Sequence, residues 1–255
     1  MNDAQRQAAV EYLLSLGDDE LVLAHRDSEW TGHAPILEED IAFANIALDE
    51  MGHAVIWYRL HADLAGKDPE TYPDHLVFQR TAEGFRNAPI VELPNGDWAF
   101  SMLRQFLFDA AEQVWLEGLG RSAHAPIAAA ARKIMTEERY HLRHTRAWTL
   151  RLGLGTEESH ARMQRALDAL WPFACDLWTA RPGEHELVTA GICPDGGSIW
   201  RTWEAEVVSQ LEKADLARPK AVQPTGFDRT HHTPHLTESL AEMQSVARLE
   251  PEGVW

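Results

Sequence analysis

Apolar residues recur at intervals of three and four along most of the chain, and few segments alternate with a period of two. Proline and glycine mark most of the breaks between the periodic segments. Pro35 and Pro126 stand where a first-turn proline belongs, because the first helical positions need no backbone N–H. The pattern predicts an almost entirely α-helical protein whose four long helices lie at about 4–26, 35–66, 97–117 and 126–152.

The connections between these helices indicate how they are arranged. Short breaks join the first helix to the second and the third to the fourth, so each pair should form an antiparallel hairpin. The segment 66–95 contains four prolines and is expected to be a long crossover with one short helix inside. One long crossover is typical of ferritin-like bundles. The predicted fold class is therefore an all-α, ferritin-like four-helix bundle.

Three further helices are predicted beyond the bundle, at about 157–180, 198–216 and 237–249. We expect them to pack around the core, because the sequence shows no low-complexity segment and no second domain. The chain should form a single ferritin-like domain over 1–255, with the core bundle at about 4–152 and the C-terminal helices at about 157–255.

Two of the core helices carry a Glu-x-x-His pair inside an otherwise apolar stripe. Glu50 and His53 interrupt the stripe of the second helix, and Glu138 and His141 interrupt that of the fourth. Residues three apart share a helix face, so each pair directs a carboxylate and an imidazole toward the interior. These ligand types suit iron or manganese. The spacing predicts a di-iron centre, with manganese as an alternative metal.

Such a centre also needs one carboxylate from each of the other two helices. Glu20 on the first helix and Asp109 on the third can each lie level with a Glu-x-x-His pair across a hairpin. Glu112, one turn beyond Asp109, could replace it as a ligand or could fix an imidazole by a hydrogen bond. The six predicted ligands form two halves with nearly the same spacing: Glu20, Glu50 and His53, then Asp109, Glu138 and His141.

A buried polar network without metal is the alternative. Burying a carboxylate costs several kcal/mol or shifts its pKa unless a partner compensates. Protonated His53 or His141, or the nearby Arg104, could be that partner in place of a metal. The short motif is weak evidence by itself, since Glu157 and His160 repeat it without an opposed pair. The apolar stripes, the repeated spacing and the predicted topology favour the metal.

Composition restricts the partners and the location. The 255 residues include 40 acidic against 23 basic side chains, for a formal charge of −17. This balance argues against nucleic acid, whose phosphates require Lys and Arg, and against anionic membrane surfaces. No stretch approaches the roughly 20 apolar residues of a membrane span, and the N-terminal residues lack signal-peptide features. Cys175 and Cys193 should be reduced thiols. We expect a cytoplasmic protein.

Several stretches resemble the PaaC-type subunits of bacterial phenylacetyl-CoA epoxidases, which are multicomponent ring 1,2-monooxygenases. They are EWTGHAP at 29–35, LPNGDWAF at 93–100, ERYHLRHTRAW at 138–148, WEAEV at 203–207 and LAEMQ at 240–244. The resemblance covers nearly the whole chain. It implies a ferritin-like fold, a role in aerobic phenylacetate catabolism and a complex with a catalytic PaaA-type subunit and a bridging PaaB-type subunit. A reductase fed by NADPH would bind only transiently.

One feature departs from that family pattern. PaaC-type subunits are generally regarded as structural partners that have lost their di-iron ligands, whereas this sequence keeps a carboxylate or histidine at all six positions. Our leading hypothesis is a subunit that mainly supports the PaaA-type chain and retains its own di-iron site, with no catalytic residue beyond it. The alternatives are a catalytically competent di-iron oxygenase and a ferritin-like iron-oxidising or storage protein, which the long C-terminal extension disfavours.

Overall fold

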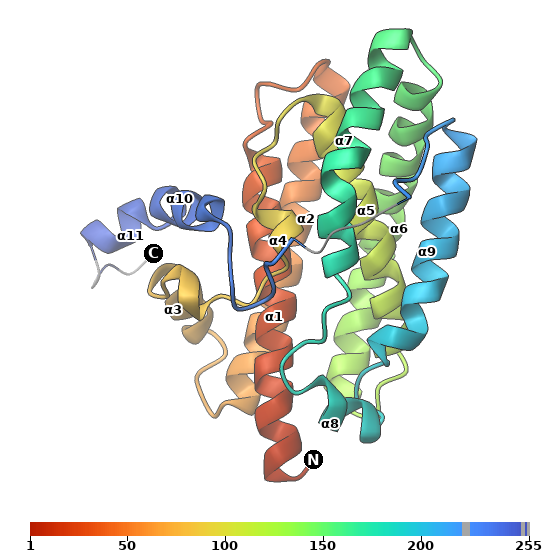
Figure 1. Cartoon of the computed structure of the whole chain (residues 1–255). Coiled ribbons are helices and arrows are strands. Elements are labelled where there is room, and N and C mark those ends of the chain that lie inside the picture. Colours follow the sequence, from red (N-terminus) through yellow and green to blue (C-terminus); the bar gives the residue numbers. More distant parts are fainter. Residues whose placement is uncertain (221–224, 251–252, 254–255) are drawn as a thin grey trace.

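The computed structural model describes residues 1–220, 225–250 and 253, and every regular element in these ranges is a helix. Helix α1 (Asp3–Ser28) packs along α2 (Leu37–Leu64), and α5 (Trp98–Leu119) packs along α6 (Ala125–Gly153) (Figure 1). These two hairpins lie side by side and form the core bundle. The prediction of an all-α, ferritin-like fold is confirmed.

The starts of the core helices follow from local sequence. Asn2 caps α1 through its side chain and the backbone of Gln5, and the Asp97 side chain caps α5. Pro126 lies in the first turn of α6, as predicted. Pro35 does not open α2, which begins at Leu37. The prediction placed this start two residues early, because the proline belongs to the connecting turns and the extended Ile36 is the N-cap.

The crossover contains more helix than predicted. Instead of one short helix it forms α3 (Tyr72–Phe78), the 3₁₀ turn η1 (Ala82–Gly84) and α4 (Pro89–Glu92). Side chains of α1 hold it in place. Asp18 accepts hydrogen bonds from the Arg86 amide (2.7 Å) and the Arg80 guanidinium (2.6 Å), and Asp19 accepts one from the Ala88 amide (2.6 Å). These long-range bonds explain why the segment is ordered despite its prolines.

In the described part of the C-terminal region there are five helices rather than the three predicted. They are α7 (Glu157–Asp176), α8 (Glu184–Thr189), α9 (Gly196–Lys213), α10 (Pro234–Met243) and α11 (Ser245–Leu249). The helix predicted at 157–180 ends earlier, before the left-handed Gly183. The one predicted at 237–249 is divided at Gln244, whose side chain donates hydrogen bonds to two carbonyl oxygens of the crossover. Helix α8 was not predicted.

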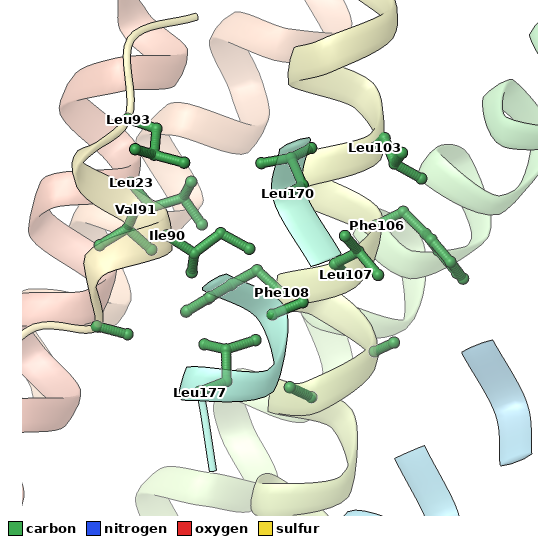
Figure 2. Packing of buried hydrophobic residues seen from close by; sticks show 14 of the residues in the cluster. Leu23, Ile90, Val91, Leu93, Leu103, Phe106, Leu107, Phe108, Leu170 and Leu177 are labelled. Atoms are coloured by element: carbon green, nitrogen blue, oxygen red, sulfur yellow. The ribbon is translucent and has the colours of Figure 1, made fainter. Parts of the chain in front are cut away.

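Helix α7 closes the bundle over α5 and α6, and α9 packs against the same two helices (Figure 1). Figure 2 shows the apolar cluster that joins these elements to α1 and to the crossover. Its labelled members are Leu23, Ile90, Val91, Leu93, Leu103, Phe106, Leu107, Phe108, Leu170 and Leu177. Within the described residues, no helix is both long enough and apolar enough to traverse a lipid bilayer.

The close contact between the end of α6 and the end of α9 generates a stability prediction. A Cβ added at Gly153 would lie 2.5 Å from the carbonyl oxygen of Ala214. Because backbone atoms cannot move aside cheaply, we expect Gly153→Ala to lower the free energy of unfolding by about 1–3 kcal/mol in urea denaturation.

Gly52→Ala is the matched control. Gly52 lies inside α2 with nothing within 4 Å of an added Cβ, so the better helix propensity of alanine should stabilise the protein by up to ~1 kcal/mol. If Gly153→Ala is as stable as the wild type, the two helix ends do not pack as closely as the structure indicates.

Candidate metal centre

The predicted ligands meet inside the bundle, and all of them are buried. Glu20 comes from α1, Glu50 and His53 from α2, Asp109 from α5, and Glu138 and His141 from α6. On α2 and α6 the burial follows from the apolar stripe on either side of each Glu-x-x-His pair. The four core helices therefore supply one polar cluster in an otherwise apolar interior.

The structure divides this cluster into two groups. Glu20, His53 and Glu112 each direct one ligand atom to within 4.8 Å of the others, and so do Glu50, Glu138 and His141. The groups adjoin, because His53 Nδ1 lies 3.4 Å from Glu138 Oε1. The centroids of the two imidazole rings are 6.1 Å apart. Two neighbouring sets of three ligands are the arrangement that a pair of metal ions requires.

Asp109 belongs to neither group, and the α5 residue that does is Glu112, which lies with Glu20 and His53. The predicted halves also differ in Glu50, which lies with Glu138 and His141 rather than with Glu20 and His53. Both carboxylate oxygens of Asp109 already accept hydrogen bonds, from the Gln105 amide at 2.9 Å and from the Thr145 hydroxyl at 2.7 Å. The same Gln105 nitrogen donates to Glu50 Oε1 at 3.0 Å. Asp109 therefore holds the surrounding side chains in position.

Each histidine turns one ring nitrogen toward the cluster and the other toward an acidic residue on the opposite hairpin. His53 Nε2 lies 2.8 Å from a carboxylate oxygen of Glu137 on α6, and His141 Nε2 lies 3.2 Å from one of Asp49 on α2. These two contacts between the hairpins fix both rings and leave Nδ1 as the ligand atom that faces the cluster. Sequence alone left open whether Asp49 and Glu137 are merely exposed surface residues.

The donor set fits a metal pair by an independent criterion, the hydrogen-bond balance of its atoms. Buried polar atoms nearly always have a hydrogen-bond partner. In this cluster, each residue of the two groups carries a buried atom that makes no well-aligned hydrogen bond, although His141 Nδ1 lies 2.7 Å from Glu138 Oε1. The atoms are Glu20 Oε2, Glu50 Oε2, His53 Nδ1, Glu112 Oε2, Glu138 Oε1 and Oε2, and His141 Nδ1. They belong to the six residues of the two groups, and Asp109 contributes none.

Arginine does not neutralise the cluster. Arg104, the candidate partner of a metal-free network, instead donates to the Leu93 carbonyl oxygen and pairs with Asp27 at 3.2 Å. The two groups hold four glutamates, so four negative charges face two imidazoles that can be neutral. Two divalent cations would balance these charges. Without metal, some of the four glutamates must be protonated to remain buried.

The pKa values of the acids show this strain in the absence of metal. Burial, followed by repulsion from neighbouring glutamates, raises the pKa of Glu20 and of Glu138 well above the usual range. Burial would also raise the pKa of Glu50, but the neighbouring Glu20 carboxyl and the two histidine rings lower it below its ordinary value. Burial opposes the charged form of His141, yet Glu138 and Glu50 raise its pKa.

Sequence reasoning found five of the six grouped residues and gave Glu112 as the alternate for the sixth. It did not find Gln105 and Thr145, which support Asp109. Glutamine and threonine inside a helix carry no spacing signal of their own. Glu112, Trp115 and Leu116 continue the buried face of α5. This helix is buried on nearly all sides, however, so the periodicity of its residues does not distinguish Asp109 from Glu112 as a ligand.

Fold and centre together define the class: an all-α, ferritin-like bundle with a carboxylate and histidine cluster that could hold metal. The sequence model for the family described as "Phenylacetic acid catabolic protein" matches residues 1–255. The C subunit of the 1,2-phenylacetyl-CoA epoxidase of Escherichia coli (strain K12) is 41% identical over 245 residues, which are 96% of this chain and 98% of that protein. The chain belongs to the phenylacetic acid catabolic protein family.

The raised pKa of Glu138 generates a pH prediction for the metal-free protein. Because the pKa of Glu138 is higher in the folded state than in the unfolded state, the bound proton stabilises the folded protein. This contribution to the free energy of unfolding is lost progressively as the pH rises above the unfolded pKa of about 4.3. Glutamine imitates the protonated acid at every pH. In thermal melts with chelator, Glu138→Gln should therefore exceed wild type in Tm by a margin that grows between about pH 5 and about pH 8.

The exposed Glu212 on α9 provides the control, because Glu212→Gln should show no such widening margin. A Tm difference between Glu138→Gln and wild type that stays constant or shrinks with rising pH would contradict the assigned burial of an uncompensated acid.

Proposed function

We propose that this chain is a subunit of a multi-subunit phenylacetyl-CoA epoxidase that serves aerobic phenylacetate catabolism. Support comes from the E. coli relative, which bears the name of such a subunit and matches this chain over nearly its full length. The family match over residues 1–255 agrees with this proposal. The protein would thus act inside a complex rather than alone.

Within that complex the chain holds two metal ions, and the observation that carries this is the set of unpartnered, buried ligand atoms. Glu20, His53 and Glu112 would hold one ion, and Glu50, Glu138 and His141 the other. Iron suits this mixture of carboxylates and imidazoles, and manganese fits it too. An iron pair bound there would supply redox chemistry with dioxygen.

The chain's main role is to support a catalytic PaaA-type partner. A cavity beside the centre, lined by Glu20, Trp57 and Glu112 among others, has a volume of only about 20 Å³. A single water needs roughly 10–15 Å³ by the same measure, so a phenyl ring does not fit. This cavity has room for a water molecule but not for an aromatic acyl group.

A second candidate function is that of a di-iron oxygenase in its own right, which the complete ligand set favours. Turnover of phenylacetyl-CoA separates the two functions. The chain loaded with iron and supplied with reductase should give no product alone, and product should form when the PaaA-type chain is added. Product without that partner would establish the oxygenase.

The proposed partners are the catalytic PaaA-type and the bridging PaaB-type subunits, with the reductase bound transiently. An exposed apolar row on α2 supports docking of a large partner. Its members face solvent at helical spacing: Leu37, Ile41, Leu48, Met51 and Val55. Apolar surface of this kind on a single chain commonly marks a protein interface.

The difference between Glu112 and Asp109 generates a metal prediction. Wild-type protein expressed with ample iron should carry two metal ions per chain, one for each group. Glu112→Gln removes a ligand charge and should lose at least one of them. Asp109→Asn removes a hydrogen-bonded supporting residue and should keep both. Elemental analysis without chelator measures the outcome, and less than about half a metal per wild-type chain would favour the metal-free polar network.

The exposed row on α2 generates a partner prediction. Leu48→Lys places a charge in the middle of the row and should weaken binding to the PaaA-type chain roughly tenfold or more, since a central apolar contact contributes over ~1 kcal/mol. Leu154→Lys is the control, because Leu154 is similarly exposed but follows α6. Calorimetry or co-elution measures both. Equal losses in the two variants would show that the row is not the docking surface.

A further inference from the structure

Tryptophan is unusually concentrated in one part of the molecule. The chain has ten tryptophans, and five of them form a continuous cluster between α5, the end of α7 and α9. Neighbouring ring centroids lie 5.3–6.2 Å apart throughout. The members of this tryptophan cluster are Trp115, Trp171, Trp178, Trp200 and Trp203.

The inner end of the tryptophan cluster lies at the candidate metal centre. Trp115 is one helical turn from Glu112 on α5, and both line the small cavity beside the centre together with Glu20. Trp115 itself is almost completely buried. Electron exchange between the centre and this indole would therefore need to cross only one side chain or one small cavity.

In the described part of the chain, Trp178 alone connects Trp115 to the outer members of the tryptophan cluster. Among the described residues, the ring of Trp115 contacts one other tryptophan, Trp178, at 5.6 Å and nearly parallel. Trp178 contacts both Trp200 and Trp203, and it is half-buried, as is Trp200. Trp171 contacts Trp203 alone within the cluster and forms a buried side branch. The shortest path outward thus runs from Trp115 through Trp178 to Trp200.

We propose that this cluster is a redox relay that carries oxidising equivalents from the metal centre to the surface of α9. This inference rests on the proposed metal centre. Indole is among the most easily oxidised side chains, and electron tunnelling between rings in contact is fast because its rate falls steeply with distance. The relay would protect the ligands of the centre when hydrogen peroxide, acting as the oxidant, reacts at the centre without a substrate.

The electron balance is closed by the indoles. Trp115 gives one electron to the oxidised centre, Trp178 replaces it, and Trp200 replaces the electron lost by Trp178. The resulting Trp200 radical cation releases its N–H proton to water and becomes a neutral radical. A second electron leaves the Trp200 radical by the same path, and water adds to the doubly oxidised ring, which gives hydroxytryptophan and releases a second proton. The two electrons and two protons reduce one hydrogen peroxide at the centre to two waters. In sum, tryptophan and hydrogen peroxide give hydroxytryptophan and water.

One charge gives the relay a direction. The Arg181 guanidinium lies 4.4 Å from the centroid of the Trp115 ring. Asp19 pairs with Arg181 at 3.3 Å and offsets part of this charge, but no cation lies over the Trp178 or Trp200 ring among the described residues. The remaining positive potential makes an oxidised Trp115 less stable than an oxidised Trp178 or Trp200. The electron vacancy therefore moves outward, away from Glu20 and Glu112, once Trp115 has given up its electron.

Mapping of oxidised residues tests the relay. Iron-loaded, full-length protein is treated with hydrogen peroxide in aerated buffer, and oxidised tryptophans are located by peptide mass spectrometry. We expect oxidation of Trp200 to be several-fold greater than in chelator-treated protein. Trp178→Phe should abolish this excess, because phenylalanine cannot be oxidised under these conditions. Trp178→Tyr should restore much of it, since tyrosine has nearly the same bulk as phenylalanine but is oxidisable.

Trp171→Phe is the control inside the same cluster, because it removes a buried ring from the side branch and should leave Trp200 oxidation unchanged. If Trp178→Phe does not fold, freeze-quench electron paramagnetic resonance of the wild type decides, and a tryptophan radical should appear only with iron. Absence of bound iron would overturn the metal centre and the relay together. Bound iron with equal Trp200 oxidation in wild type and Trp178→Phe, or in wild type and chelated protein, would overturn the relay alone.

Discussion

Four glutamates and an aspartate share the interior of one helical bundle, and the cost of removing them from water constrains the rest of the structure. Each buried charge costs several kcal/mol unless it is paired or protonated. Among the described residues, the ion pairs of Glu20, Glu50 and Glu138 are with histidine rather than with lysine or arginine, and the guanidinium of Arg104 is bound elsewhere. Without metal the cluster must bind protons, as the raised pKa values of Glu20 and Glu138 indicate. Divalent cations remove the same penalty and leave the carboxylates ionised.

This constraint explains why so much polar structure surrounds the ligands. Asp109 binds Gln105 and Thr145, and Gln105 in turn binds Glu50, so adjacent turns of α5 and α6 are locked in register. Asp49 and Glu137 hold the two histidine rings from opposite hairpins. These contacts hold the ligands around a common space, where His141 Nδ1 and Glu138 Oε1 lie 2.7 Å apart and several carboxylate oxygens have no hydrogen-bond donor.

The crossover and the C-terminal helices complete the structure around the bundle. On α1, Asp18 and Asp19 lie immediately before Glu20, and their carboxylates hold the crossover through buried hydrogen bonds. Asp19 also binds Arg181 and Arg229, which come from the C-terminal region. The same turn of α1 therefore provides a ligand, anchors the crossover and fixes the later segments. Arg181 continues this link to the tryptophan cluster through its contact with Trp115.

Sequence by itself predicted the four core helices and five of the six residues in the two candidate ligand groups. Periodic apolar residues located the four core helices, and a Glu-x-x-His pair within an apolar stripe identified Glu50, His53, Glu138 and His141, because helical periodicity decides which residues share a face. Local rules also placed Pro126 in the first turn of its helix, although Pro35 was assigned to the helix it only precedes.

Tertiary structure decided what depends on contacts distant in sequence. The extra helices of the crossover and α8 are short, and their order comes from bonds to other segments rather than from their own periodicity. The different environments of Asp109 and Glu112 also depend on packing, because Gln105 and Thr145 donate hydrogen bonds to Asp109 while Glu112 Oε2 has no hydrogen-bond partner. The tryptophan cluster likewise unites α5, α7 and α9. No sequence period links these rings, because their contacts arise only when the helices pack.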